Sequence, residues 1–190
     1  MQALDLYRYT GIAGIAAGIM NVIVELLPER IGLPLDMLIN ILGLWVLSAL
    51  YLRQREVSGV FGLIAYTIQF LGITLVVGFL FTQAFVLLEL DAVQRAAILA
   101  GPAGLAAILA LGLMTIGAVL FGIATLQAGV FPKWAALLLM AGFIIVPLGA
   151  VGPQIIKTIG ELILSGGLIS MSYALFLSAQ AGTSTQLASN

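Results

Sequence analysis

The sequence predicts an all-α protein, a polytopic transmembrane bundle of six helices. Hydrophobic residues make up 62% of the 190 residues and charged residues only 8%, whereas about a quarter of the residues are charged in a soluble domain. Six apolar runs also have the length of about 20 residues that a helix needs to cross a bilayer. Lipid is therefore the expected surroundings of most of this chain.

The apolar runs are expected to be helices because a segment in lipid must satisfy its own backbone hydrogen bonds. Together they predict one transmembrane domain over residues 1–178, and the small, uncharged residues of 179–190 predict a flexible polar tail. The predicted helices span residues 9–27, 34–52, 58–88, 92–126, 132–151 and 155–178.

Turn-forming and charged residues mark the first boundaries. Pro28 and Pro34 bound the first turn, and the charged segment 53–56 forms the second. Asp91 and Gln94 predict a capping box, in which each residue bonds to the backbone of the other, at the start of the fourth helix.

Prolines mark the later boundaries and predict two bends. Pro132 suits the first turn of the fifth helix, and Pro153 with Gly152 separates the last two helices. Pro102 and Pro147 fall inside apolar runs, where each removes a backbone hydrogen bond and should bend its helix. We interpret these bends as packing kinks; the alternative is a gate or hinge.

The third and fourth runs are longer than a bilayer requires. The 31 residues of 58–88 would extend roughly 45 Å as a helix, against a hydrocarbon layer of about 30 Å. These two helices are therefore expected either to tilt strongly or to form a hairpin that projects from the membrane.

The distribution of charge predicts the orientation. If six helices alternate in direction, four of the seven basic residues lie on the side of the termini and six of the eight acidic residues lie on the other side. Basic loops are retained in the cytoplasm. We therefore expect both termini to be cytoplasmic in a multi-pass protein of the cell inner (cytoplasmic) membrane.

The absence of histidine and cysteine from the sequence restricts the metal sites and catalytic groups that the chain can form. It removes the usual ligands of zinc, haem and iron–sulfur centres and the nucleophile pairs Ser-His and Cys-His. We predict no cofactor, no metal site and no enzymatic activity. The expected partners are the lipid bilayer and a second membrane protein or a further copy of the chain, with no nucleic acid.

Polar residues within the apolar runs are the candidates for a binding site, because ionisable groups are costly in a bilayer. In the alternating arrangement Glu25, Asp36 and Glu161 lie toward the outer leaflet, where an acidic vestibule would bind a cation or a proton. The favoured interpretation is that these carboxylates reach headgroups or water and that the amides only join helices, and the vestibule is the alternative. The candidate residues are Asn21, Glu25, Asp36, Asn40, Gln69 and Glu161.

Small residues recur along the first helix at helical spacing and permit close approach of another helix. Packing within the chain is the favoured interpretation over dimerisation. The helix-packing residues predicted in this way are Gly11, Ala13, Gly14, Ala17 and Gly18.

Two segments carry a resemblance to known proteins. LFGIATLQAGVFPKWAALLL (120–139) and YLRQREVSGVFGLIAYTIQFLG (51–72) resemble a broad group of uncharacterised small bacterial multi-pass membrane proteins with six helices. The shared pattern is a helix ending in Leu-x-Ala-Gly, followed by proline, a basic residue and tryptophan, and the resemblance covers about two thirds of the chain. It implies a bacterial helical bundle with no assigned activity. The residues of the pattern are Ala128, Gly129, Pro132, Lys133 and Trp134.

The chain is also similar, more weakly, to the substrate-binding subunits of energy-coupling-factor transporters, which have six helices and comparable size. Ala13 and Ala17 match the small-xxx-small motif with which those subunits contact a partner. The short external loops of this chain depart from that family, since they carry few polar or aromatic groups to cover a vitamin.

Two functions follow as hypotheses. A non-enzymatic accessory or structural subunit of a membrane complex needs only lipid-embedded surfaces that fit a partner. A small-solute or ion carrier, or a substrate-binding transporter subunit, needs polar groups that converge on one cavity toward the outer leaflet. The sequence places the accessory subunit first and the carrier close behind it.

Overall fold

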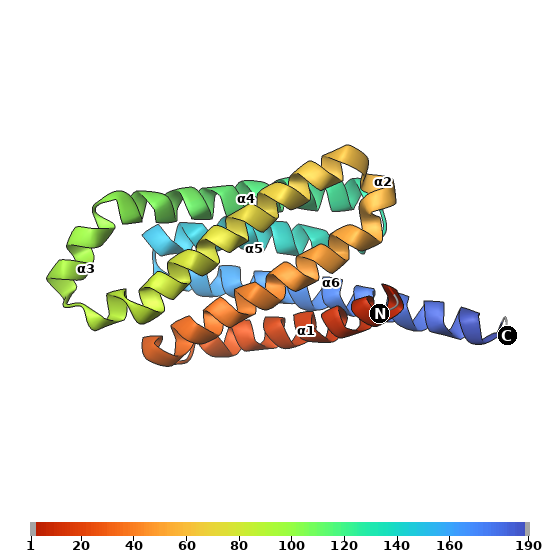
Figure 1. Ribbon diagram of the computed structural model, residues 1–190, viewed down its shortest axis with the longest axis horizontal. Coiled ribbons are helices and arrows are strands. Elements are labelled where there is room, and N and C mark those ends of the chain that lie inside the picture. Colours follow the sequence, from red (N-terminus) through yellow and green to blue (C-terminus); the bar gives the residue numbers. More distant parts are fainter. Residues whose placement is uncertain (1–2, 189–190) are drawn as a thin grey trace.

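The described part of the chain is helical, without a strand (Figure 1). In this computed structural model the backbone is described for residues 3–188 and the side chains for 5–149 and 152–180. The elements in chain order are α1 (Ala3–Val24), α2 (Glu29–Phe85), the 3-10 helix η1 (Leu87–Glu89), α3 (Ala92–Leu99), α4 (Pro102–Ala128), α5 (Lys133–Val151) and α6 (Gln154–Ala188).

The longest helix, α2, consists of two arms that run in opposite directions (Figure 1). They meet at Gly59, whose φ of 56° and ψ of −146° are not helical and belong to a region that glycine enters without steric penalty. We call residues 29–58 the first arm and 60–85 the second arm. The segment 53–56, predicted to be the turn, is therefore helical, and the chain reverses at the glycine that follows it.

The helices form a ring. α1 contacts α6 and α2, α2 contacts α4, α4 contacts α5, and α5 contacts α6. The two arms of α2 meet through Tyr51 and Tyr66, whose rings stack with centroids 4.5 Å apart, and Ser48 shares a hydrogen bond of 3.0 Å with the Tyr66 hydroxyl. This arrangement brings side chains from all the long helices to one central axis.

Glycines allow the close contact between α1 and α6. A Cβ atom added to Gly18 would lie 2.5 Å from Cγ1 of Ile169, and one added to Gly11 would lie 2.8 Å from Cβ of Phe176. Gly14 faces Ser172, and Ala17 is fully buried. Four of the five small residues predicted to mediate packing therefore lie inside the bundle, and the fifth, Ala13, is only half-buried.

Several predicted boundaries are confirmed. Gln94 N donates to Asp91 Oδ1 at 2.8 Å and Asp91 N donates to Gln94 Oε1 at 3.4 Å, which is the expected capping box. α5 begins directly after Pro132, and the break before α6 falls at 152–153. Pro147 lies inside α5 as expected.

Three details of the predicted helices are wrong. The run 92–126 is divided into α3 and α4, and Pro102 begins α4 instead of bending a longer helix, because a first-turn residue needs no backbone N–H. α2 begins at Glu29, so Pro34 lies inside it. α6 continues through most of 179–190 as far as Ala188, since this alanine- and glutamine-containing segment has no proline to end it; residues 189 and 190 lie outside the described backbone.

Three stretches are long and apolar enough to span a membrane: Glu29–Glu89, Pro102–Ala128 and Gln154–Gln180, while Lys133–Gly149 is apolar but shorter. The two chain ends lie at the same end of the bundle (Figure 1). At the opposite end, the hairpin formed by the end of α2, η1, α3 and the start of α4 extends beyond the α1–α2 and α5–α6 turns (Figure 1).

The contact between the second arm of α2 and α4 should depend on Gly72. A Cβ atom there would collide with the backbone of Met114, so Gly72→Ala should destabilise the protein by about 1–3 kcal/mol. Gly78 lies on the same arm, and a Cβ atom added to it would have no neighbour within 4 Å, so Gly78→Ala should cause no loss. Thermal unfolding of both variants in detergent checks this, and equal melting temperatures would contradict the close contact.

Candidate functional site

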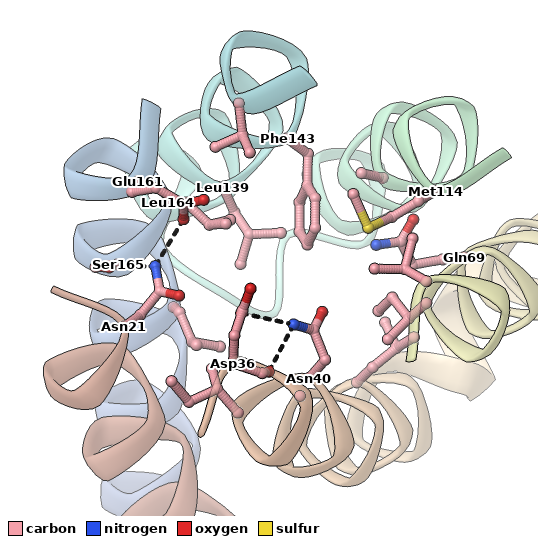
Figure 2. A pocket seen from close by; sticks show the side chains of 18 of the residues that line it. Asn21, Asp36, Asn40, Gln69, Met114, Leu139, Phe143, Glu161, Leu164 and Ser165 are labelled. Atoms are coloured by element: carbon pink, nitrogen blue, oxygen red, sulfur yellow. Dashed lines mark hydrogen bonds between the residues drawn. The ribbon is translucent and has the colours of Figure 1, made fainter. Parts of the chain in front are cut away.

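A cavity of about 590 Å³ lies along the axis of the ring. Its walls come from α1, both arms of α2, α4, α5 and α6. This volume is within the range of about 300–1,000 Å³ that small-molecule sites occupy. Figure 2 shows the polar side chains of its wall, which cluster on α1, the first arm of α2 and α6.

One polar group of the wall joins α1 to α6. Asn21 Nδ2 donates to Glu161 Oε2 at 2.8 Å and to Ser165 Oγ at 3.0 Å (Figure 2). The two acceptors are four residues apart on α6 and therefore lie on the same helix face. The asparagine thus holds the Glu161 side chain at the cavity wall.

A second polar group is local to the first arm of α2. Asn40 Nδ2 donates to the backbone oxygen of Asp36 at 2.9 Å and to its Oδ1 at 3.1 Å. Figure 2 shows the Asp36 carboxylate pointing toward the cavity interior. Among the described residues, no ion pair joins either carboxylate to a basic side chain.

The lysine of this region is already paired. Lys157 Nζ lies 2.6 Å from Glu25 Oε1, with side-chain exposures of 35% and 15%, and Gln154 Nε2 donates to the other Glu25 oxygen at 3.4 Å. Lys157 lines the cavity, whereas Glu25 does not. Glu25 therefore acts on the cavity indirectly, by neutralising the lysine beside it.

Gln69 lies on the second arm of α2, across the cavity from the carboxylates. The residue is 2% exposed and its Oε1 has no hydrogen-bond partner, while Figure 2 shows the amide nitrogen turned toward the interior. Its backbone contacts α4 at Gly117, where a Cβ atom would lie 2.5 Å from the Gln69 Cα. A buried amide without a full set of partners is costly, and here it faces the cavity.

Apolar side chains line most of the remaining wall, which extends toward the end of the bundle that holds the termini. There Gln54 Nε2 donates to Thr125 Oγ1 at 3.1 Å, and Thr125 donates to the Phe121 backbone oxygen at 2.8 Å. The cavity thus has a polar end near the α1–α2 turn and an apolar end near Thr125. The main apolar residues of the wall are Leu47, Leu50, Ile73, Leu111, Met114, Phe121, Leu139, Phe143, Leu168 and Met171.

The structure brings together five of the six candidates: Asn21, Asp36, Asn40, Gln69 and Glu161 line one cavity, and Glu25 lies behind it. Sequence reasoning missed the roles of Lys157 and Ser165. The spacing of Lys157, Glu161 and Ser165 at every fourth position places all three on one face of α6, and that pattern was the available signal.

The arrangement suits the binding of a small molecule. Among the residues with described side chains, no three acidic, histidine or cysteine groups are placed to hold a metal ion. The polar end supplies carboxylate and amide groups, and the rest supplies apolar surface. This combination fits a small molecule with one polar end.

No protein-family model, curated protein or solved structure matches the chain.

The Glu25–Lys157 pair should stabilise the α1–α6 contact. Glu25→Gln and Lys157→Gln should each lower the free energy of unfolding by about 1–3 kcal/mol, between the values of surface and buried pairs. The double variant should lose less free energy of unfolding than the two single variants lose together, by a coupling energy of about 1 kcal/mol or more. Chemical unfolding of the four proteins in detergent measures this.

A matched control is the ion pair of Arg30 and Glu89, which are 74% and 68% exposed. Arg30→Gln should change stability by no more than about 1 kcal/mol. Additive effects of the Glu25 and Lys157 substitutions would show that their contact contributes nothing.

Proposed function

We propose that this protein is a multi-pass membrane protein with six spans that binds a small solute in its central cavity, as a carrier or as the substrate-binding subunit of a transporter. The observation that carries the proposal is the cavity itself, on which polar residues from α1, α2 and α6 converge. It is non-enzymatic in this proposal, and the solute reaches the cavity from the polar end.

The helix lengths support six spans. α2 has 57 residues and would be roughly 85 Å long if straight, which far exceeds a bilayer of about 30 Å; each of its two antiparallel arms is long enough for one crossing. α1, with 22 residues, and α5, with 19, have lengths of roughly 33 Å and 28 Å.

The outer surface supports the same topology. Every long helix exposes large apolar side chains, and soluble proteins rarely expose so much continuous apolar surface. Examples from successive helices are Ile19, Ile41, Leu75, Ile108, Leu137 and Leu162.

The cavity favours solute binding over a purely structural role. An accessory subunit needs complementary outer surfaces but no interior space, whereas a binding protein needs both a space and groups that orient a ligand. We therefore place the solute-binding function ahead of the accessory subunit. The similarity to substrate-binding subunits of energy-coupling-factor transporters is compatible with this proposal, in which a membrane partner would complete the transporter.

Filling the cavity should abolish binding. Gly43 lines the cavity and has no atom within 4 Å of an added Cβ, so Gly43→Leu should occupy the space without displacing a helix. Native mass spectrometry of protein extracted from its host membrane in mild detergent should detect a bound small molecule in the wild type. The variant should carry less than about a tenth of it, because the space that the ligand needs is filled.

Gly112→Leu is the matched control, because Gly112 also has free space around its Cβ but lies outside the cavity wall. It should retain the ligand. A wild type that carries a stoichiometric protein partner and no small molecule would overturn the binding function in favour of the accessory subunit.

Six spans with cytoplasmic termini make a topological prediction for a bacterial inner membrane. A green fluorescent protein fused after Asn190 should fluoresce, because that end is predicted to lie in the cytoplasm. Alkaline phosphatase inserted between Leu90 and Asp91 should be active, because this turn is predicted to lie outside. Each reporter is also tested at the other site. Active phosphatase after Asn190 with fluorescence at the Leu90–Asp91 turn would show the opposite orientation, and fluorescence at both sites would exclude six spans.

A further inference from the structure

The charges around the cavity are unbalanced at its polar end. Asp36 and Glu161 have amide donors but no ion pair, and the nearby Lys157 is bonded to Glu25. Carboxylates in largely apolar surroundings are costly unless a positive charge compensates them. With the Glu25–Lys157 pair counted as neutral, Asp36 and Glu161 leave an excess of negative charge at the described polar end, which a bound cation would offset.

We propose that the cavity binds an amphipathic organic amine, with its ammonium group at Asp36 and Glu161 and its apolar body directed along the wall toward Phe121. This inference rests on the proposed solute-binding function and specifies the ligand class. The two carboxylates line the same cavity, Asp36 from α2 and Glu161 from α6 (Figure 2), so the proposed ammonium group would have acceptors on two helices.

The size and lining of the cavity favour an organic cation over a bare metal ion. A bare metal ion would use six to eight oxygen ligands for calcium or an octahedral set for magnesium, and no three acidic groups converge among the described side chains. A cavity of about 590 Å³ also far exceeds the volume of an ion. Its apolar wall instead provides a surface for a hydrocarbon or aromatic body, whose burial contributes about 25 cal/mol per Å².

The wall opposite the carboxylates gives a second, independent indication of a ligand. Gln69 is only 2% exposed, its Oε1 has no partner, and it lines the cavity beside Met114 (Figure 2). An amide both donates and accepts hydrogen bonds. A ligand that extends from Asp36 across the cavity would place its body against this amide and could share one hydrogen bond with it.

An anion does not fit the same site. Two carboxylates would repel it, and the lysine that would attract it already contacts Glu25 at 2.6 Å. A neutral alcohol would fill the space without compensating either charge. The order of affinity expected from the charges is therefore amine, then alcohol, then carboxylate.

The test uses three compounds with one body: 4-phenylbutylamine, 4-phenylbutanol and 4-phenylbutanoate. Calorimetric titration of the full chain in phosphatidylcholine nanodiscs should show the amine binding at least about tenfold more tightly than the alcohol, since hydrogen bonds to charged groups are the stronger ones. Asp36→Asn and Glu161→Gln should each reduce amine affinity toward that of the alcohol, and should reduce alcohol affinity by much less, because the alcohol carries no positive charge for the carboxylates to compensate.

Thermal unfolding serves as the folding control for both variants, and Glu56→Gln, an exposed carboxylate at the other end of the bundle, should leave all affinities unchanged. Equal or tighter binding of the alcohol or carboxylate to the wild type would overturn the amine assignment while the solute-binding function stands. If none of the three compounds binds, the amine assignment is overturned. The proposed function is tested separately, and the absence of a bound small molecule in native mass spectra would overturn it.

An ammonium on an apolar body occurs both in free amines and in ethanolamine phospholipids. Repeating the titration in nanodiscs that contain phosphatidylethanolamine distinguishes these sources. If the amine binds more weakly in these nanodiscs than in phosphatidylcholine alone, and Asp36→Asn removes that difference, the lipid headgroup is a competing ligand of the same site. Unchanged amine affinity supports a free amine as the ligand.

Discussion

The close packing of α1 against α6 determines the geometry of the polar end of the cavity. Gly14 and Gly18 allow the two backbones to approach, and Asn21, one turn further along α1, then reaches Glu161 and Ser165 at 2.8 and 3.0 Å. Hydrogen bonds of this length do not survive a displacement of about an ångström. The glycines of α1 therefore affect the binding site although they do not touch it.

The same structure separates an apolar exterior from a partly polar interior. In lipid, helices gain little from apolar contact with each other, so polar contacts and close packing hold them together. Gln54 with Thr125 and Ser48 with Tyr66 are such contacts between helical segments. Four buried side-chain atoms of the described residues lack a partner, and of the residues that carry them only Gln69 lines the cavity.

Helical periodicity explains how much of the site could be predicted. Asp36 with Asn40 is a local pair, four residues apart, and such pairs can be identified in a sequence before any fold is known. The Asn21–Glu161 bond joins residues 140 positions apart, and only the ring order of the helices brings them together. Glu25 looked equivalent to Glu161 because both are acidic and near a helix end, but the position of Lys157 separates their roles.

The fold shows the same division between local and tertiary information. The capping box of Asp91 and Gln94 is local, and it was predicted correctly. The position of the α2 reversal was not, because the charged segment 53–56 is compatible with a turn or with a helix end exposed to water. Its helical state depends on Gln54, which is fully buried and bonded to Thr125 of α4; this tertiary contact extends the helix to Gly59.

That contact also distinguishes the two forms of the proposed function. In the proposed function, the Gln54–Thr125 bond, which joins the first arm of α2 to α4 at the cavity wall, would hold the apolar end closed to a solute that enters from the polar end. A substrate-binding subunit can keep this end closed until a partner acts on it. A carrier must separate Gln54 from Thr125 by itself, and the two arms of α2 meet close to this contact, at Gly59 with its non-helical φ and ψ.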